Sequence, residues 1–403
     1  MDLRSERPYW PSTCRRPRLR SSLSRRGRVD VLIVGAGVTG ALVAYALAKA
    51  GARVAVVDNR AAGSGSTPAS TALLQYEIDT PLVKLSAALG RAHAEAAYKA
   101  SRGALDDIVR IDRELGGGID LLPRRSLQLA VKPSDVRTLR AEVAARQRLS
   151  FPVSMLSRAA LRSKFSLNRP GAILSEEALE VNPLKLTYRL LSAAKERGVC
   201  ILPRTRLNLS TLATKTRPFR VELPDGGRVV ADRVVMATGY ETPEQFREIA
   251  VVTELRSTFA LATEPLSREP WPERALLWDA GDPYFYARTT ADLRVMIGGE
   301  DEPFTTAAAR DAMLASKTRT LMKNLRDLVP RLRFQCAFCW AGTFASTKDG
   351  LPYIGEHHRF PGVSFALGYG GNGITFSVIA ADIIAAAFGG SIHPAAKLFT
   401  FDR

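Results

Sequence analysis

The hydrophobic pattern of the chain opens with a continuous apolar run, "VDVLIVG", at residues 29–35. A run without polar alternation is typical of a strand that is buried on both faces of a parallel sheet. The next segments are "ALVAYALAKAG" (41–51), which predicts a helix ending at Gly51, and "ARVAVVD" (52–58), which predicts a second buried strand. The pattern therefore predicts a strand–helix–strand unit over residues 29–58.

Further along the chain the pattern changes to shorter runs. Residues 96–154 contain helical stretches and one expected strand, "SLQLAV" (126–131), and residues 305–329 predict a helix that returns the chain to the first domain. Between them, four segments read as strands: "VVTELRSTFALAT" (251–263), "ALLWDA" (275–280), "YFYARTT" (284–290) and "LRVMIGG" (293–299). The apolar segment 373–390 carries Asp382 and reads as a buried helix, so we expect no membrane span.

The glycines Gly35, Gly37 and Gly40 join the first strand to the first helix in a G-x-G-x-x-G pattern. In dinucleotide-binding folds the first glycine permits the turn, the second admits a pyrophosphate, and the third allows close packing of helix and strand. Asp58 ends the second strand 18 residues after Gly40, where an acid can bind ribose hydroxyls. The basic and apolar start also resembles a secretory signal, but Asp30 and the second strand argue against that interpretation.

The length and composition fit a two-domain globular protein of 403 residues with 46% hydrophobic residues. Four cysteines are too few for a disulfide scaffold and suggest a reducing compartment, hence a cytoplasmic location.

Residues 1–28 hold nine arginines and two acidic residues, so they supply +7 of the net charge of +17. We expect this segment to be an extended arm. Basic arms can bind nucleic acid or anionic lipid, but the excess of arginine is spread along the chain, which favours a soluble basic protein.

Four blocks of sequence narrow the choice of dinucleotide. They are "DNRAAGSGSTPASTALLQYEIDTPL" (58–82), "GGRVVADRVVMATGYE" (226–241), "WAGTFASTKDGLPYIG" (340–355) and "FALGYGGNGITFSVIAADIIAAAFGG" (365–390). Together they resemble the D-amino-acid oxidase superfamily of flavoproteins, which includes glycine oxidase, sarcosine oxidase and glutamylputrescine oxidase. The resemblance extends from about residue 29 to the C-terminus.

The resemblance implies an α/β fold in which a discontinuous Rossmann-like domain binds FAD non-covalently and a second domain presents a mostly antiparallel sheet over the flavin. The implied FAD-binding domain comprises residues 29–95, 155–245 and 340–403, and the implied substrate domain comprises residues 96–154 and 246–339. The implied FAD-binding residues, besides Gly35, Gly37, Gly40 and Asp58, are Val38, Thr39, Asn59, Ser66, Thr67, Thr71, Ala72, Leu73, Leu207, Gly239, Tyr369, Gly370, Gly371, Asn372, Gly373, Ile374 and Thr375.

The implied reaction is hydride transfer from a C–H bond beside an amine nitrogen to the flavin, after which electrons pass to O₂ or to an electron-acceptor protein. The cofactor carries this chemistry, so no catalytic Ser/His/Asp set or carboxylate pair is needed. The four histidines are scattered along the chain. Cys336 and Cys339 form a single C-x-x-C pair, which reads as buried thiols rather than as a metal site or a flavin attachment point.

The chain departs from the family pattern at two arginine positions. Amino-acid oxidases of this family place an arginine where this chain has Phe344, and glycine-oxidase-like members place a second one where it has Gly371. A small amino acid would therefore lose the usual partners of its carboxylate. Arg288 is a possible substitute anchor or a salt-bridged arginine, and Tyr286, Trp340 and Phe344 are candidate walls of a pocket for a larger or aromatic amine.

A third departure concerns the electron acceptor. Met296 aligns with a lysine that helps sarcosine-oxidase-like members to activate O₂, so both an oxidase and a dehydrogenase are compatible with the sequence. Two other functions remain open. The same flavin geometry could oxidise a substrate that is not an amine, or the protein could be a flavin-bearing binding or assembly subunit that docks through its basic arm.

Overall fold

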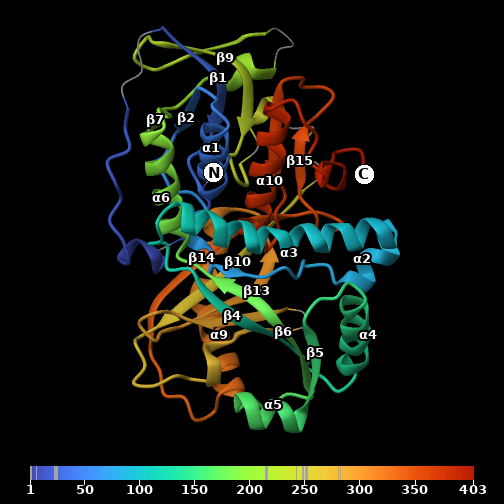
Figure 1. Cartoon of the computed structure of the whole chain (residues 1–403). Coiled ribbons are helices and arrows are strands. Elements are labelled where there is room, and N and C mark those ends of the chain that lie inside the picture. Colours follow the sequence, from blue (N-terminus) through green and yellow to red (C-terminus); the bar gives the residue numbers. More distant parts are fainter. Residues whose placement is uncertain are drawn as a thin grey trace.

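The computed structural model describes residues 2–5, 7–21, 26–213, 217–241, 243–246, 249, 253–279, 281 and 283–403. In this part of the chain the strands form one seven-stranded and one nine-stranded sheet. Figure 1 shows the two sheets in opposite halves of the molecule, with helix α3 (Arg91–Glu114) crossing between them. The architecture matches the predicted α/β class, with a parallel-sheet half and a mostly antiparallel half.

The seven-stranded sheet grows around the predicted strand–helix–strand unit. Its order is β15 (Tyr353–Glu356), β16 (Val363–Leu367), β9 (Arg228–Met236), β1 (Arg26–Val34), β2 (Val54–Asp58) and β7 (Cys200–Pro203), with β8 (Phe219–Glu222) paired to β9. The ladders from β16 to β7 are parallel, and β15 and β8 are antiparallel additions. Along β1, Val31 and Ile33 enter one core cluster while Leu32 and Val34 enter another. The strand is buried on both faces, as its unbroken apolar run predicts.

Helices cover one face of this sheet. Helix α1 (Val38–Lys49) packs between α6 (Pro183–Glu196) and α10 (Gly373–Phe388), and α10 also contacts α3. Helix α10 is the apolar segment near the C-terminus, and most of its first ten residues are buried. Within the described residues, no helix combines the length and the apolar character needed to cross a membrane.

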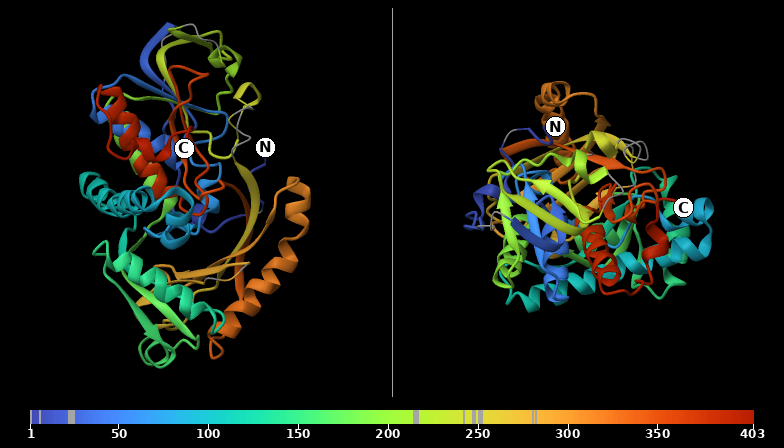
Figure 2. Two further views of the ribbon diagram at one scale, coloured as in Figure 1. Left: turned by 90° about the vertical axis from the view of Figure 1, so that its right-hand side faces the viewer. Right: turned by 90° about the horizontal axis from the view of Figure 1, so that it is seen from above.

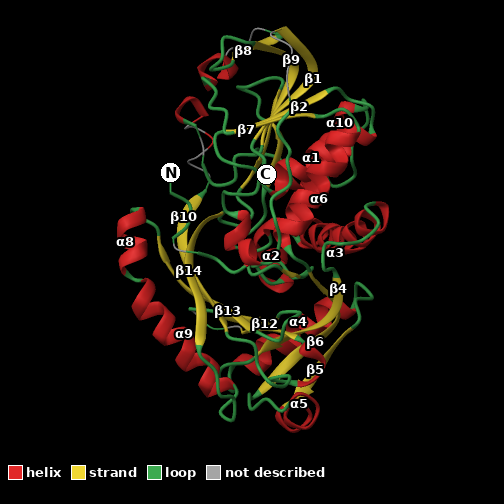
Figure 3. Cartoon of the chain, turned by 90° about the vertical axis from the view of Figure 1, so that its left-hand side faces the viewer, coloured by secondary structure: helices red, strands yellow, loops and turns green. Residues whose placement is uncertain are grey.

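The nine-stranded sheet has the order β14 (Cys336–Ser346), β10 (Glu254–Thr263), β13 (Val295–Pro303), β12 (Phe285–Thr289), β11 (Leu276–Asp279), β4 (Leu122–Leu129), β6 (Gly171–Glu180) and β3 (Leu73–Leu74), with β5 (Val153–Ser157) paired to β6. Its ladders are antiparallel except for β11 with β4. Helices α8 (Ala307–Ala312) and α9 (Leu314–Leu328) lie along the outer side of this sheet (Figures 2 and 3). The remaining helices of this half are α2 (Leu82–Leu89), α4 (Asp135–Gln147) and α5 (Arg158–Phe165).

The sheets divide the chain differently from the segments expected from sequence. Residues 155–180 were expected in the FAD-binding domain, but β6 and part of β5 pair within the nine-stranded sheet. Residues 340–346, which were also expected in the FAD-binding domain, form part of β14 and therefore belong to the nine-stranded sheet. The expected helix 305–329 is interrupted at Met313 and packs on β10, β13 and β14. The sequence pattern of a strand does not show which other strands it pairs with. The sheet to which residues 155–180 and 340–346 belong could therefore not be read from the pattern.

The N-terminal arm has little regular structure in its described residues, 2–5 and 7–21, yet it packs against both halves of the molecule. Leu3, Tyr9, Trp10 and Leu19 are buried. Backbone bonds join Ser5 N–H to Ala341 O at 3.0 Å and Thr343 N–H to Leu3 O at 2.9 Å, so the first residues lie alongside β14. The apolar side chains, which are isolated among arginines in the sequence, fix the arm to the body of the protein.

The partly buried carboxyl group of Asp382 on α10 should make the stability of the protein depend on pH. Burial, helped by nearby Asp107, raises the pKa of Asp382 to about 6. Because the folded state then holds the proton more tightly than the unfolded state, this group favours folding at low pH, and the benefit is lost as the pH rises through about 6. We expect Asp382→Asn to raise the free energy of unfolding by about 1–2 kcal/mol at pH 7.5 and by much less at pH 4.5. Urea unfolding at both pH values measures this, and an equal gain at both would contradict it.

Candidate active site

A single cavity of about 760 Å³ runs from the first strand–helix turn to the nine-stranded sheet. Its lining comes from the turn after β1, the end of β2, most of residues 65–79, residues 205–210, residues 237–241, 243 and 245, and residues 369–374. The nine-stranded sheet contributes Thr258, Trp278, Tyr286, Thr343 and Phe344, and Tyr284 lies just before β12. The cavity is therefore long, and its two ends differ in chemistry.

The glycine turn at the first end is shaped by close backbone contacts. Gly35 has φ of +115°, and a Cβ atom there would lie 2.2 Å from Ala237 O. A Cβ atom on Gly40 would lie 1.9 Å from Gly35 O, so the third glycine lets α1 pack directly against the turn. Helix α1 begins beyond Gly37 without a side-chain cap, and Val38 N–H donates to Thr67 Oγ1 at 3.1 Å. The helix N-terminus thus faces the cavity with a positive dipole end suited to a pyrophosphate.

Asp58 lies at the end of β2 beside this turn. Its Oδ2 accepts a hydrogen bond from Ala36 N–H at 2.7 Å, and its Oδ1 accepts one from Arg60 N–H at 2.7 Å. Burial raises the pKa of Asp58, and these two N–H donors oppose that effect. Arg60 is held in turn by a bidentate ion pair with Glu241. These contacts fix the Asp58 carboxylate in the cavity lining.

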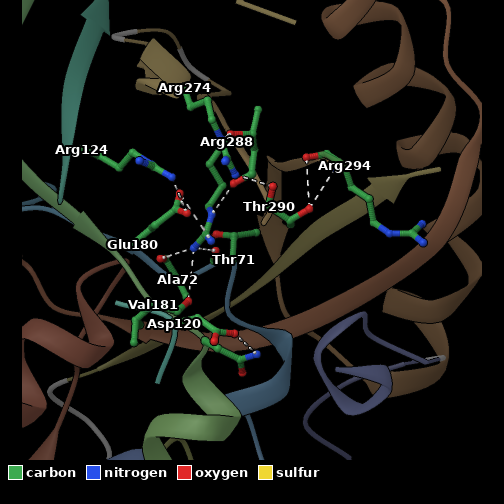
Figure 4. A network of polar contacts seen from close by, with 12 residues as sticks. Thr71, Ala72, Asp120, Arg124, Glu180, Val181, Arg274, Arg288, Thr290 and Arg294 are labelled. Atoms are coloured by element: carbon green, nitrogen blue, oxygen red, sulfur yellow. Dashed lines mark hydrogen bonds and ion pairs between the residues drawn. The ribbon is translucent and has the colours of Figure 1, made fainter. Parts of the chain in front are cut away.

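The loop 66–73 runs from the glycine turn towards the nine-stranded sheet. Arg288 binds the backbone of this loop on the side that faces away from the cavity. The Arg288 Nη1 group donates to Ala72 O at 2.7 Å, and to Thr71 O and Val181 O at 3.3 Å (Figure 4). Its Nη2 lies 3.6 Å from Glu180 Oε2. Burial lowers the pKa of Arg288, and Glu180 counteracts this. The guanidinium is buried against the loop backbone and does not line the cavity.

Some buried polar atoms in the cavity lining have no hydrogen-bond partner in the described part of the protein. Among the described residues, buried Ser66 Oγ, Thr238 Oγ1 and Asn372 Oδ1 have no hydrogen-bond partner in the protein, and all three residues line the cavity. A buried polar group without a partner costs about 1–3 kcal/mol, so such groups mark a site completed by a bound molecule. They are spread along the cavity from the loop after β2 to the start of α10, which fits one long polar ligand such as FAD.

The comparison with protein families agrees with this geometry. Residues 30–387 match the family model DAO, described as FAD dependent oxidoreductase. The chain belongs to the DAO family. FAD is accordingly its cofactor, and the enzyme is an FAD-dependent oxidoreductase.

Relatives within the DAO family have sequences of similar length. Glycine oxidase of Geobacillus kaustophilus is 26% identical over 373 residues, which cover 89% of this chain and 92% of that protein. D-amino acid dehydrogenase of Rhizobium rhizogenes is 25% identical over 412 residues, covering 88% and 95%. Among solved structures, L-proline dehydrogenase from P. horikoshii superposes with a TM-score of 0.77 at 18% identity, covering 93% of this chain and 97% of that one, and shows the shared fold.

The predicted DAO cofactor residues gather in one place. All of them line the cavity except Gly40, which packs on Gly35, and Thr375, which is buried and donates to Gln75 O at 3.4 Å. Of the predicted pocket residues, Tyr286 and Phe344 line the cavity. Arg288, Met296 and Trp340 do not line it. Trp340 was expected as a wall, Met296 as the residue beside the flavin, and Arg288 as an anchor or a salt-bridged arginine; Arg288 forms an ion pair with Glu180.

Arg288 and Met296 lie further along the strands than Tyr286, whereas Trp340 lies in the same cross-strand row as Tyr286. Met296 pairs with Arg288 in the β12–β13 ladder, two positions beyond the pair formed by Gly298 and Tyr286. Trp340 is buried, and its Nε1 donates to Ala69 O at 2.9 Å. The loop and the N-terminal arm cover this part of the face, with Trp10 stacked 5.4 Å from the Arg288 guanidinium carbon.

Several cavity residues were not singled out from the sequence. They are Asp79, Thr258, Trp278, Tyr240 and Tyr284. None carries a local motif, because each reaches the cavity through long-range folding.

The four histidines lie outside the cavity lining, and so do the half-buried thiols Cys336 and Cys339 on β14. Cys336 Sγ donates to Phe338 O at 3.3 Å.

Proposed function

We propose that this enzyme oxidises a C–N bond of an amine or amino-acid-like substrate. The observation that carries the proposal is the continuity of the cavity, which joins a dinucleotide-type turn to a pocket walled by tyrosines and Phe344. When bound, FAD supplies a two-electron acceptor for hydride. The substrate loses a hydride from carbon and a proton from nitrogen, and the resulting imine takes up water to give a carbonyl compound and an amine.

Residues at the first end are proposed to hold FAD along the cavity. The α1 N-terminus with Val38 and Thr39 would receive the pyrophosphate, Asp58 and Asn59 the ribose, and Leu207 the adenine. The loop 66–73 and the run 369–374 would enclose the flavin ring. Backbone N–H groups near Gly370 and Gly373, with the dipole of α10, would stabilise negative charge on the ring.

The pocket end is proposed to position the amine and exclude water. Burial raises the pKa values of Tyr240, Tyr284 and Tyr286, so these phenols stay protonated and can donate hydrogen bonds. Phe344 stands where related amino-acid oxidases have an arginine. A wall of this kind suits a bulky or aromatic amine better than a small amino acid. Electrons would then leave to O₂ or to an electron-acceptor protein.

Anaerobic titration tests the proposal. We expect the purified protein to carry FAD and its visible absorption to bleach on addition of members of a panel of primary and secondary amines. Bleaching by a hydroxy compound and by no amine would favour oxidation of a non-amine substrate. Bleaching only in the presence of a protein partner would favour the subunit hypothesis. Either result would overturn amine oxidation as the function.

A further inference from the structure

The carboxylate of Asp79 projects into the pocket end of the cavity. Asp79 lies between β3 and α2, and its Oδ2 accepts a hydrogen bond from Gly371 N–H at 2.8 Å. A Cβ atom on Gly370 would lie 2.4 Å from Asp79 Oδ2, and one on Gly371 would lie 2.8 Å from Oδ1. The carboxylate therefore occupies space next to Gly371, the position where glycine-oxidase-like proteins carry an arginine.

Asp79 has no ion-pair partner among the described residues. It lines the cavity. Desolvation raises its pKa, and the Gly371 N–H opposes this. The described cations that line the cavity are Arg60 and Arg206, both near the expected adenosine end. Arg256 acts on Tyr284 and Asp301 but does not line the cavity. The pocket end is therefore negatively charged.

The Asp79 carboxylate acts on the ionisable groups around it. Asp79 is close enough to raise the pKa values of Tyr240, Tyr284 and Tyr286. It also contributes to the raised pKa of Asp301, which burial brings to about 6. Aromatic faces beside a carboxylate attract a cation and gain little from an anion.

The segment that carries Asp79 is held rigidly. Glu77 pairs with buried Arg146 at 3.2 Å, Asn372 Nδ2 donates to Glu77 O at 2.7 Å, and Tyr98 OH donates to Thr80 O at 3.1 Å. Glu142 accepts the first N–H groups of α2 at 2.8 and 3.0 Å. A fixed carboxylate can discriminate between ligands because it cannot swing away from the cavity.

We propose that Asp79 binds a protonated ammonium group of the substrate, so that the enzyme selects amines with a positive charge remote from the C–N bond that is oxidised. This inference rests on the proposed function and names its substrate class. The reacting nitrogen is neutral and the second nitrogen is charged, as in a diamine. A substrate carboxylate at this place would face Asp79 and lose affinity.

The test compares 1,4-diaminobutane with n-butylamine and glycine in anaerobic reduction of the flavin. The wild-type enzyme should reach half-maximal reduction rate at a concentration of diamine that is roughly 10–100-fold lower than that of monoamine, as one charge-assisted hydrogen bond allows. Asp79→Asn should bring the ratio of the two half-maximal concentrations, n-butylamine to diamine, close to one, and Asp79→Glu should restore part of the ratio. The matched control is Asp106→Asn, the same change at an exposed position on α3.

A binding measurement separates recognition from turnover. tert-Butylamine has no hydrogen on its α-carbon, so it is a cation that cannot be oxidised, and tert-butanol is its neutral counterpart. Calorimetry should detect tert-butylammonium binding to the wild-type holoenzyme but not to Asp79→Asn, with no binding of tert-butanol to either. Thermal unfolding and FAD content confirm that the variant is folded.

The outcomes distinguish the two proposals. If monoamines or glycine bleach the flavin as well as the diamine does, the inference fails and amine oxidation stands. If Asp79→Asn keeps the diamine preference, the inference also fails. If no amine reduces the wild-type enzyme, the proposed function itself fails.

Discussion

Deletion of residues 2–21 is expected to lower the free energy of unfolding by several kcal/mol and to weaken retention of FAD. The deletion removes the buried side chains of Leu3, Tyr9, Trp10 and Leu19, and burial of each large apolar side chain contributes about 1.5–3 kcal/mol. It also removes the bond from Trp10 Nε1 to Ser70 O at 2.6 Å. Urea unfolding measures the first effect, and flavin absorbance after prolonged dialysis measures the second.

The effect on FAD follows from where the arm makes contact. Arg16 Nη2 donates to Ser64 Oγ at 2.8 Å, and Leu3 lines the cavity itself. Ser64 lies just before the loop 66–73, which is expected to follow the phosphates, and Ser70 lies within that loop. Without the bonds to these two serines the loop loses order, and ordering it again on FAD binding costs conformational entropy.

The control variant removes positive charge from the arm but keeps its buried apolar side chains. Arg15 and Arg20 are exposed, so Arg15→Ala combined with Arg20→Ala should change stability by less than about 0.5 kcal/mol. If the double variant loses as much stability as the deletion, charge rather than burial fixes the arm. DNA retention by the deletion variant, compared with the full chain, tests the separate idea of a nucleic-acid-binding arm.

The glycine turn and Asp58 could be predicted from the residues because their determinants are local, whereas the later FAD-binding residues were implied by the family resemblance. One stretch, residues 29–58, contains the buried strands, the glycines and the terminal acid, and their periodicity follows from hydrogen-bond geometry. The structure confirms the strand–turn–helix geometry around Gly35 and Gly40. The docking of the arm could not be predicted in the same way, because Tyr9, Trp10 and Leu19 lie in a segment rich in arginine, proline and serine and show no period.

The pocket end could be predicted only in part because it is assembled over long sequence distances. The resemblance to the D-amino-acid oxidase superfamily indicated the strands that carry Tyr286 and Met296. It did not indicate how far along the strands the cavity extends, which depends on the arm and on loop 69–72. Asp79 has no motif at all, and its exposure to the cavity depends on glycines almost 300 residues later.

Arg146→Met is expected to lower the free energy of unfolding by about 3–5 kcal/mol at pH 7. Arg146 is fully buried, and its guanidinium lies 2.9 Å from Glu142 Oε1 and 3.2 Å from Glu77 Oε1. It also stacks within 5.8 and 5.9 Å of the Tyr76 and Tyr98 rings. Methionine fills much of the volume but leaves two buried carboxylates without a cation. Urea unfolding at pH 7 measures the loss.

The pH dependence identifies the cause of this loss. Burial already raises the pKa of Glu77, and loss of Arg146 would raise it further, so the carboxyl group can be neutral in the folded variant at lower pH. The deficit should therefore shrink between pH 7 and pH 5, and addition of Glu77→Gln should recover part of it. Arg110→Met, which breaks two exposed ion pairs on α3, with Asp107 and Glu114, should cost less than about 1 kcal/mol. A deficit that is independent of pH would mean that lost packing, rather than uncompensated charge, destabilises the variant.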